Sequence, residues 1–328
     1  MISSKMPRIL ATLLGAAAIV SLPGHVLANP TYPERPIQLV VGFSAGGPAD
    51  LVARTLAPAL GRELGTTIVV ENKPGADGSI AATLVAKAKP DGYTLLIAPN
   101  THSINASLYK KLPFDSAKDF AAVTLIGESP NIVAVNASVP VTSIKELIEH
   151  AKAADPSLNY GSSSSITQFA TELFNIQAGI KMQRIPYKGA GQAIPALLSG
   201  EVPVMFSSIM TLLPHIEGGR VRALAVTSAS RVPLAPDLPT VAESGLPGYE
   251  ASTWYGLLAP AQTPKPVIAR LYEAMEKVLA DGEIREKLEA QGLVLQNQIN
   301  DPAAFQAYLQ ADIERWRPVI EATGVAIH

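Results

Sequence analysis

The sequence contains no cysteine. Disulfide bonds and thiolate metal sites are therefore excluded. A chain of 328 residues can bury enough apolar surface to be stable without covalent cross-links. At roughly 100–200 residues per domain, this length predicts about two domains.

The chain also lacks an excess of charge of either sign. Its 26 basic and 28 acidic residues give a net charge of -2, and no five basic residues occur in a row. Nucleic acids and anionic membranes attract proteins with a basic excess. We therefore expect neither as a partner.

Recognised catalytic and cofactor motifs are missing as well. The sequence has no G-x-G-x-x-G, no G-x-x-x-x-G-K-[ST] and no H-E-x-x-H, the patterns of dinucleotide, nucleotide and zinc sites. Asp77, Asp91 and Asp115 lie in glycine or proline turns, where aspartate commonly bonds the local backbone. We expect no metal and no cofactor.

The first residues have the three-part layout of a secretory signal peptide. Lys5 and Arg8 precede an uncharged apolar run over residues 9–22, and small residues follow up to Ala28. This pattern predicts a signal peptide over residues 1–28 and an exported, periplasmic chain from Asn29. An uncleaved N-terminal anchor is the alternative.

Short β-branched runs alternate with helical patterns, which predicts an α/β architecture with parallel strands. Ile37–Val41 is a continuous apolar run, as expected for a buried strand, and a helix follows from Pro48. A capping box at Ser143 opens a later helix. After a proline- and glycine-rich connector over residues 232–249, we expect one strand and two helices that pack back on the first unit.

Residues 42–46 read GFSAG, a match to the nucleophile elbow of serine hydrolases. The elbow normally follows a central strand, whereas Ser44 follows the first one expected in the mature chain. A nucleophilic serine also needs a base, and we place only His102 near Ser44. Hydrolysis through Ser44 is therefore the lesser hypothesis.

The same stretch also reads as a strand, a glycine turn and a helix start, an arrangement that binds anions. Further loops rich in glycine, serine or threonine are expected at strand ends, where open α/β sheets bind ligands. Unpaired N–H groups at helix starts favour an anion. The expected ligand-binding residues are Phe43, Ser44, Ala45, Gly46, Gly47, Thr101, His102, Ser162, Ser163, Ser164, Ser165, Thr167, Tyr187, Lys188, Gly189 and Ser207.

Each of these loops has a plain structural alternative when taken singly. Gly46 and Gly47 could form only a tight turn with Asp50 as the helix cap. The serine run over residues 162–165 could be a solvated loop, and Lys188 a surface lysine. The recurrence of such loops at strand ends favours the binding hypothesis.

Several segments resemble the periplasmic substrate-binding receptors of the tripartite tricarboxylate transporter family, the Bug-type, TctC-like proteins. They follow the family order along nearly the whole mature chain. The matching stretches are residues 32–37, Phe43 with Gly46, Gly47 and Asp50, VENKPG at 70–75, KPDGYTL at 89–95, PYKG at 186–189, PTVAESGLPG at 239–248, WYG at 254–256 and residues 259–264.

The resemblance implies a two-lobed periplasmic binding protein of the Venus-flytrap, type II-like kind. Each lobe would be a mainly parallel sheet flanked by helices. Domain 1 would comprise residues 29–130 and 228–328, and domain 2 residues 131–227, with the ligand cleft between them. The loop at residues 43–47 would hold a carboxylate on main-chain groups, and the loop at 161–167 would form the second pincer.

The expected function is that of a monomeric receptor that closes around a small mono- or dicarboxylate and delivers it to a membrane permease, without enzymatic activity. Family members usually have proline where this chain has Ser44, aspartate in place of Ser207, and more glycine around residues 162–165. Loss of an acidic group at Ser207 predicts a cleft that better accepts a doubly negative or an uncharged polar ligand. A sensory or scaffold protein without a transport role is the remaining alternative.

Overall fold

The computed structural model describes residues 32–295, 299 and 301–327. The predicted signal peptide lies outside these residues. Within the described ranges, no helix is both long and apolar enough to cross a membrane.

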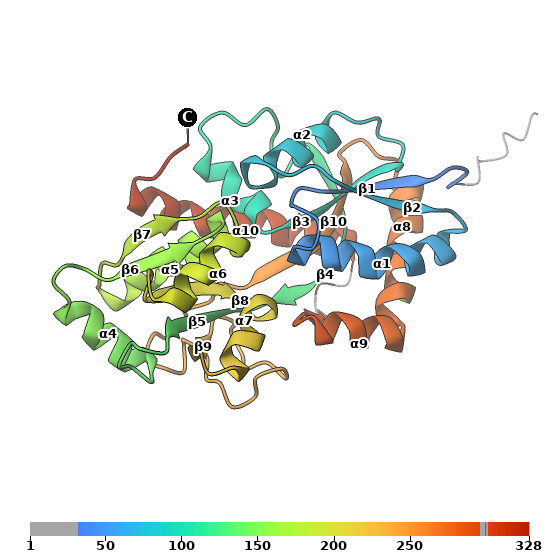
Figure 1. The fold of residues 1–328 in the computed structure, drawn as a ribbon. Coiled ribbons are helices and arrows are strands. Elements are labelled where there is room, and N and C mark those ends of the chain that lie inside the picture. The colour runs from blue at the N-terminus through green and yellow to red at the C-terminus, as the bar shows by residue number, and fades with distance from the viewer. Residues whose placement is uncertain (1–31, 296–298, 300, 328) are drawn as a thin grey trace, which may run out of the picture. The chain divides into compact units, whose positions relative to one another are not determined.

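A first sheet has six strands in the order β11-β4-β10-β3-β1-β2 (Figure 1). β1 pairs in parallel with β2 and β3, whereas β10 runs antiparallel to both β3 and β4. Its strands are β1 (Ile37–Val41), β2 (Ile68–Asn72), β3 (Thr94–Pro99), β4 (Phe120–Ser129), β10 (Thr253–Pro260) and β11 (Val294–Leu295). The helices that accompany it in sequence are α1 (Pro48–Leu64), α2 (Ser79–Ala86), α3 (Thr101–Leu108), α8 (Lys265–Ala280), α9 (Gly282–Ala290) and α10 (Pro302–Thr323).

A second sheet has five strands in the order β7-β6-β8-β5-β9. β6 pairs in parallel with β7 and β8, and β5 runs antiparallel to β8 and β9. Its strands are β5 (Asn131–Asn136), β6 (Asn159–Ser162), β7 (Gln183–Pro186), β8 (Val204–Ser208) and β9 (Val221–Val226). The helices between them are α4 (Ile144–Ala153), α5 (Ser165–Ala178), α6 (Ala190–Ser199) and α7 (Ile209–Glu217).

The predicted two-lobed α/β class is confirmed, and the sheets, expected to be mainly parallel, are mixed. In the first sheet β10 and β11 run antiparallel to the other strands, and in the second sheet β5 does. The chain passes from the first sheet to the second at Pro130, between β4 and β5, and returns between β9 and β10. The strands of residues 131–226 therefore all belong to the second sheet.

The structure corrects three details of the sequence reading. The expected loop at residues 100–103 is mostly the start of α3, and Ser207 lies within β8 rather than in a loop. Three helices follow β10 instead of two, because Asp281 caps a separate α9 through the amides of Glu283 and Ile284. Polar buried faces, as in α3, lack the apolar spacing by which a helix is recognised.

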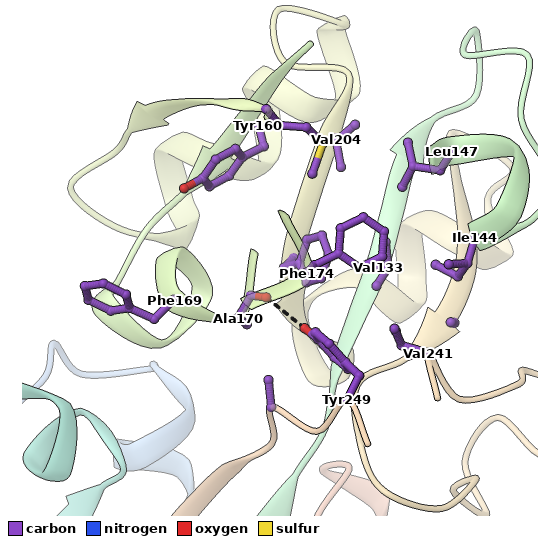
Figure 2. Close-up of a cluster of buried hydrophobic side chains, with 14 of the residues drawn as sticks. Val133, Ile144, Leu147, Tyr160, Phe169, Ala170, Phe174, Val204, Val241 and Tyr249 are labelled. Carbon is purple, nitrogen blue, oxygen red and sulfur yellow. Dashed lines mark hydrogen bonds between the residues drawn. The ribbon is translucent and has the colours of Figure 1, made fainter. Parts of the chain in front are cut away.

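The connector before β10 is anchored on α5 in the core of the second sheet. The Tyr249 hydroxyl donates to the carbonyl of Ala170 at 2.9 Å, and its ring packs edge-on against Phe174 (Figure 2). The side chains of Tyr249 and Phe174 are completely or almost completely buried. This contact holds α5 in place, so that the N-terminus of this helix has a defined position.

Helix α10 is tied to β10 by one buried carboxylate. Asp312 accepts a hydrogen bond from Trp254 Nε1 at 2.8 Å and a second from Arg315 at 2.8 Å. Asp312 and Trp254 are buried. Removing the carboxylate would leave two donors without their acceptor.

We expect Asp312→Ala to lower the free energy of unfolding by about 3 kcal/mol, because the buried Trp254 N–H would be left unpaired and Arg315 would lose its ion pair with Asp312. Glu314→Ala on the same helix is the matched control, since Glu314 pairs with Arg317 while exposed, and should change stability by less than about 0.5 kcal/mol. Denaturant unfolding followed by circular dichroism measures both. Equal effects would contradict the assigned role of Asp312.

Candidate functional site

The loop between β1 and α1 presents main-chain amides to solvent. Gly46 has a φ of 78°, which glycine adopts without steric cost. Its amide donates to Asp50 at 2.8 Å, and the Gly47 amide donates to the Ser44 carbonyl at 3.2 Å. Ser44 and Ala45 are exposed, and their amides have no acceptor among the described residues. Two donors in the loop before α1 are thus available to an anion.

Asp50 holds this loop in shape. Its carboxylate is buried and accepts from Gly46, from Arg54 at 2.9 Å and from Asn72 at 2.9 Å. Burial raises the pKa of the Asp50 carboxyl, but these hydrogen bonds outweigh it and the pKa is lowered. Asn72 also donates to the Phe43 carbonyl at 3.0 Å. The tight turn predicted as an alternative to a binding loop is therefore present, but Gly47 is the helix cap and Asp50 lies in the first turn of α1. The Ser44 and Ala45 amides stay outside this network.

The second predicted pincer lies at the start of α5. The amides of Ser163 and Ser164 donate to Thr167 Oγ1 at 3.1 and 3.2 Å. Ser162 Oγ accepts from Arg184 at 2.6 Å. These polar groups are already used within the protein.

The next amide of this loop is also occupied, by a residue that precedes the second sheet. Ser165 N donates to Asp77 Oδ2 at 2.8 Å, across 88 positions of sequence. Asp77 lies in the short 3-10 turn Ala76–Gly78 between β2 and α2. Burial raises the pKa of its carboxyl, against the opposing effects of Ser165 and Arg184. Asp77 thus links the first sheet's loops to a helix of the second.

The loops after β1, β2 and β3 enclose a small cavity of about 10 Å³. It is lined by Phe43, Asp77, Thr101, His102 and Asn105, among others. A Cβ placed on Gly78 would lie 3.3 Å from the ring of Phe43, so these loops are closely packed. The structure therefore brings Phe43, Thr101 and His102 together, and Asp77 connects them to Ser165.

His102 borders this cavity, but its ring belongs to an aromatic cluster. The imidazole stacks on Phe114 and meets Phe120 edge-on, with ring centroids 5.8 and 4.7 Å apart. Its Nε2 donates to the Ser116 carbonyl at 2.8 Å. Burial lowers the pKa of His102 to about 4. The ring is therefore neutral at neutral pH.

The remaining predicted site residues belong to or follow strands of the second sheet, and Tyr187 lies beside the second pincer because its amide donates to the Ser162 carbonyl at 2.8 Å. The Tyr187 hydroxyl donates to Glu201 at 3.0 Å, Lys188 is exposed and Gly189 precedes α6. Ser207 Oγ lies 3.3 Å from Thr211 Oγ1. Among the described residues no hydrogen bond joins these four to the loop at residues 43–47 or to Asp77. Their role in binding stays a prediction.

Comparison with known proteins shows the family of this chain. The model of the tripartite tricarboxylate transporter family receptor matches residues 52–325. Protein BugT of Bordetella pertussis is 33% identical over 326 residues, which cover 98% of this chain and 99% of BugT. This chain belongs to the tripartite tricarboxylate transporter receptor family. The resemblance inferred from the motifs is confirmed.

Solved structures of related receptors share this fold. MatC from Rhodopseudomonas palustris, with bound malate, has a TM-score of 0.79 and 32% identity, covering 88% of this chain and 100% of its own. A second R. palustris protein, with adipate, has a TM-score of 0.82 and 35% identity, covering 90% and 99%. Because the matches cover 88% and 90% of this chain, the structural similarity includes both sheets.

In this receptor no described histidine is a hydrogen-bond partner of Ser44. His102 is bonded to Ser116, and His215 contacts Arg220 at 2.6 Å. His150 lies within α4. A serine hydroxyl without a base is a weak nucleophile, so the geometry gives the hydrolase hypothesis no support.

Asp77 is the residue of this site that sequence reasoning missed. Because Asp77 lies in the turn Gly75–Gly78, the sequence predicts an aspartate that forms a hydrogen bond to the local backbone. Asp77 does accept a hydrogen bond from a backbone amide. The amide, however, belongs to Ser165. The available signal was an acidic residue between two turn glycines at the end of a strand, and spacing alone could not reveal its partner.

We expect the stability of the receptor to fall as the pH drops from 6.5 towards 4, in part through His102. The unfolded chain binds this proton with a pKa near 6.5 and the folded protein only near 4. Stability from the neutral ring is therefore present above pH 6.5 and is lost at lower pH, by up to about 1.4 kcal/mol per pH unit.

His102→Gln should flatten this part of the profile, as measured by denaturant unfolding at several pH values. His150→Gln on α4 is the control and should keep the wild-type slope. A His102→Gln profile parallel to that of wild type would show that the His102 ring titrates normally.

Proposed function

We propose that this chain is a periplasmic solute-binding receptor that captures a small organic carboxylate and passes it to the membrane permease of a tripartite tricarboxylate-type transporter. It binds its ligand without transforming it. The observation that carries this proposal is a pair of main-chain amides in the loop before α1: Ser44 and Ala45 are exposed, and their amides have no acceptor among the described residues.

Charge and geometry at this loop suit a carboxylate. A helix N-terminus favours an anion by about 0.3–1 kcal/mol, and exposed amides can donate to both oxygens of one carboxylate. No Lys or Arg is needed, because the donors are main-chain groups. The dicarboxylates bound by MatC and by its R. palustris relative support an acid as the ligand class.

Capture by hinge closure is supported by the way in which the chain passes between the sheets. Asn131 N donates to Thr227 Oγ1 at 2.9 Å, and Thr227 N donates back to the Asn131 carbonyl at 2.9 Å. Asn131 Nδ2 also donates to the Ala251 carbonyl at 3.1 Å. The segments that connect the two sheets, at residues 130–131 and at 227 and 251, are thus hydrogen-bonded to one another and form one hinge region. The proposed domains remain residues 29–130 with 228–328, and 131–227, with the connector before β10 packed through Tyr249 on α5 of the second domain.

A ligand that bridges the two domains would shift the open–closed equilibrium by its greater affinity for the closed form. The permease would then recognise both lobes of the closed receptor together. Such a receptor works as a single chain, so we propose a monomer.

The proposal predicts that one acid in a panel of mono-, di- and tricarboxylates and aromatic acids raises the melting temperature of the mature chain. Binding to the native state alone stabilises it, by about 2.7 kcal/mol at a ligand concentration of 100 Kd. A thermal-shift screen followed by calorimetric titration measures this. The absence of a shift with every acid would favour the scaffold or sensory alternative, and labelling of Ser44 by a fluorophosphonate would favour the hydrolase.

Main-chain contact at the first loop predicts that Gly46→Ala abolishes ligand affinity while Ser44→Ala leaves it nearly unchanged. Gly65→Ala is the matched control, because Gly65 has a φ of 70° at the other end of α1 and Gly46 one of 78°, both with open space around the missing Cβ. Each alanine costs roughly 1–2 kcal/mol of stability. Loss of affinity in Ser44→Ala, or equal loss in the two glycine variants, would count against main-chain binding.

A further inference from the structure

We propose that Asp77 sets the ligand class of this receptor. Its carboxylate occupies the helix N-terminus that would otherwise take a second ligand carboxylate. The receptor therefore binds an acid with one carboxylate, whose far end carries a hydrogen-bond donor, and discriminates against dicarboxylates. This inference rests on the proposed function.

The Asp77 carboxylate lies at the N-terminus of α5. It accepts the amide of Ser165, the first residue of α5, at 2.8 Å. α5 has 14 residues, so its N-terminus carries the partial positive charge of a full helix. The Asp77 carboxylate already lies at this partial positive charge. A ligand carboxylate would therefore have to displace the Asp77 carboxylate.

The local backbone aims Asp77 at α5. Ala76 and Asp77 have φ values of 47° and 52°, a region that non-glycine residues seldom adopt. Asn105 Nδ2 donates to the Asp77 carbonyl at 3.0 Å and to Ser79 Oγ at 3.0 Å. The strained turn is thus fixed from α3, as is common for residues with a functional role.

The same cavity contains a hydrogen-bond acceptor without a partner among the described residues, the side-chain oxygen of Asn105. Asn105 is buried, and its Oδ1 has no hydrogen-bond partner among the described residues. The amide cannot be turned over, because the Asp77 carbonyl requires a donor. Leaving a buried acceptor unpaired is costly, so a ligand gains affinity if it supplies a donor group of about the size of one water, which is what a cavity of about 10 Å³ can hold. Asp77 and Asn105 both line this cavity, together with Phe43.

These three observations define the far end of the ligand. A carboxylate there would meet the like charge of Asp77 and the lone pairs of Asn105 Oδ1, which is unfavourable at short range. An ammonium or primary amide group has more than one N–H and could donate to both, whereas a hydroxyl could donate to one of them. The near carboxylate would remain on the Ser44 and Ala45 amides.

The test uses the mature chain and acids of four to six carbons in matched sets: the dicarboxylate, its half-amide, the ω-hydroxy acid and the ω-amino acid. Calorimetric titration should show that wild type binds a donor-ended acid at least tenfold more tightly than the dicarboxylate of the same length. Asp77→Asn removes the charge with little change in shape. It should raise dicarboxylate affinity at least tenfold.

Asp77→Gly is the second variant and guards against misfolding, since glycine adopts the positive φ freely. It frees the Ser165 amide and should also gain dicarboxylate affinity, while relief of the positive φ offsets part of the stability lost with the Ser165 hydrogen bond. Glu149→Gln, which removes an exposed charge from α4, is the control and should keep the wild-type preference.

The outcomes separate this inference from the proposed function. Wild type that binds a dicarboxylate as tightly as its donor-ended partners, with no gain in Asp77→Asn, would overturn the role of Asp77 while leaving the receptor function intact. Failure of wild type and all variants to bind any acid would overturn the proposed function itself. A gain of dicarboxylate binding in the two Asp77 variants alone would support both.

Discussion

The hydrogen bond between Asp77 and the Ser165 amide is the interaction on which the arrangement of the site depends. It joins a loop of the first sheet to the first residue of α5, which belongs to the second. The loops after β1, β2 and β3 pack around Asp77 and share one small cavity. A single carboxylate thus connects the loops of the two sheets.

The two helix N-termini of the site differ in how their amides are used. At α1, Asp50 takes only the Gly46 amide and leaves those of Ser44 and Ala45 exposed. At α5, Thr167 and Asp77 together accept from residues 163–165. The Ser44 and Ala45 amides before α1 therefore have no acceptor among the described residues, whereas the amides at the start of α5 are held by Thr167 and Asp77.

Support for this geometry is distributed over distant parts of the chain. Tyr249 anchors the connector on α5, and Asn131 is bonded to Thr227 where the chain passes between the sheets. Asp312 ties α10 to β10. Buried polar contacts of this kind are costly to break once formed, so they give the loops of the site a rigid frame about which closure can occur.

The sequence by itself determined the α/β class, the strand and helix of the first binding loop, the family and the absence of cysteine chemistry, because apolar periodicity, glycine turns and motifs are local properties. Tertiary structure alone decided that β10 and β5 run antiparallel in mixed sheets, that His102 lies in an aromatic cluster, and that Asp77 reaches Ser165. Each of these depends on contacts between residues far apart in the chain, and no local pattern encodes which distant amide a turn aspartate will meet.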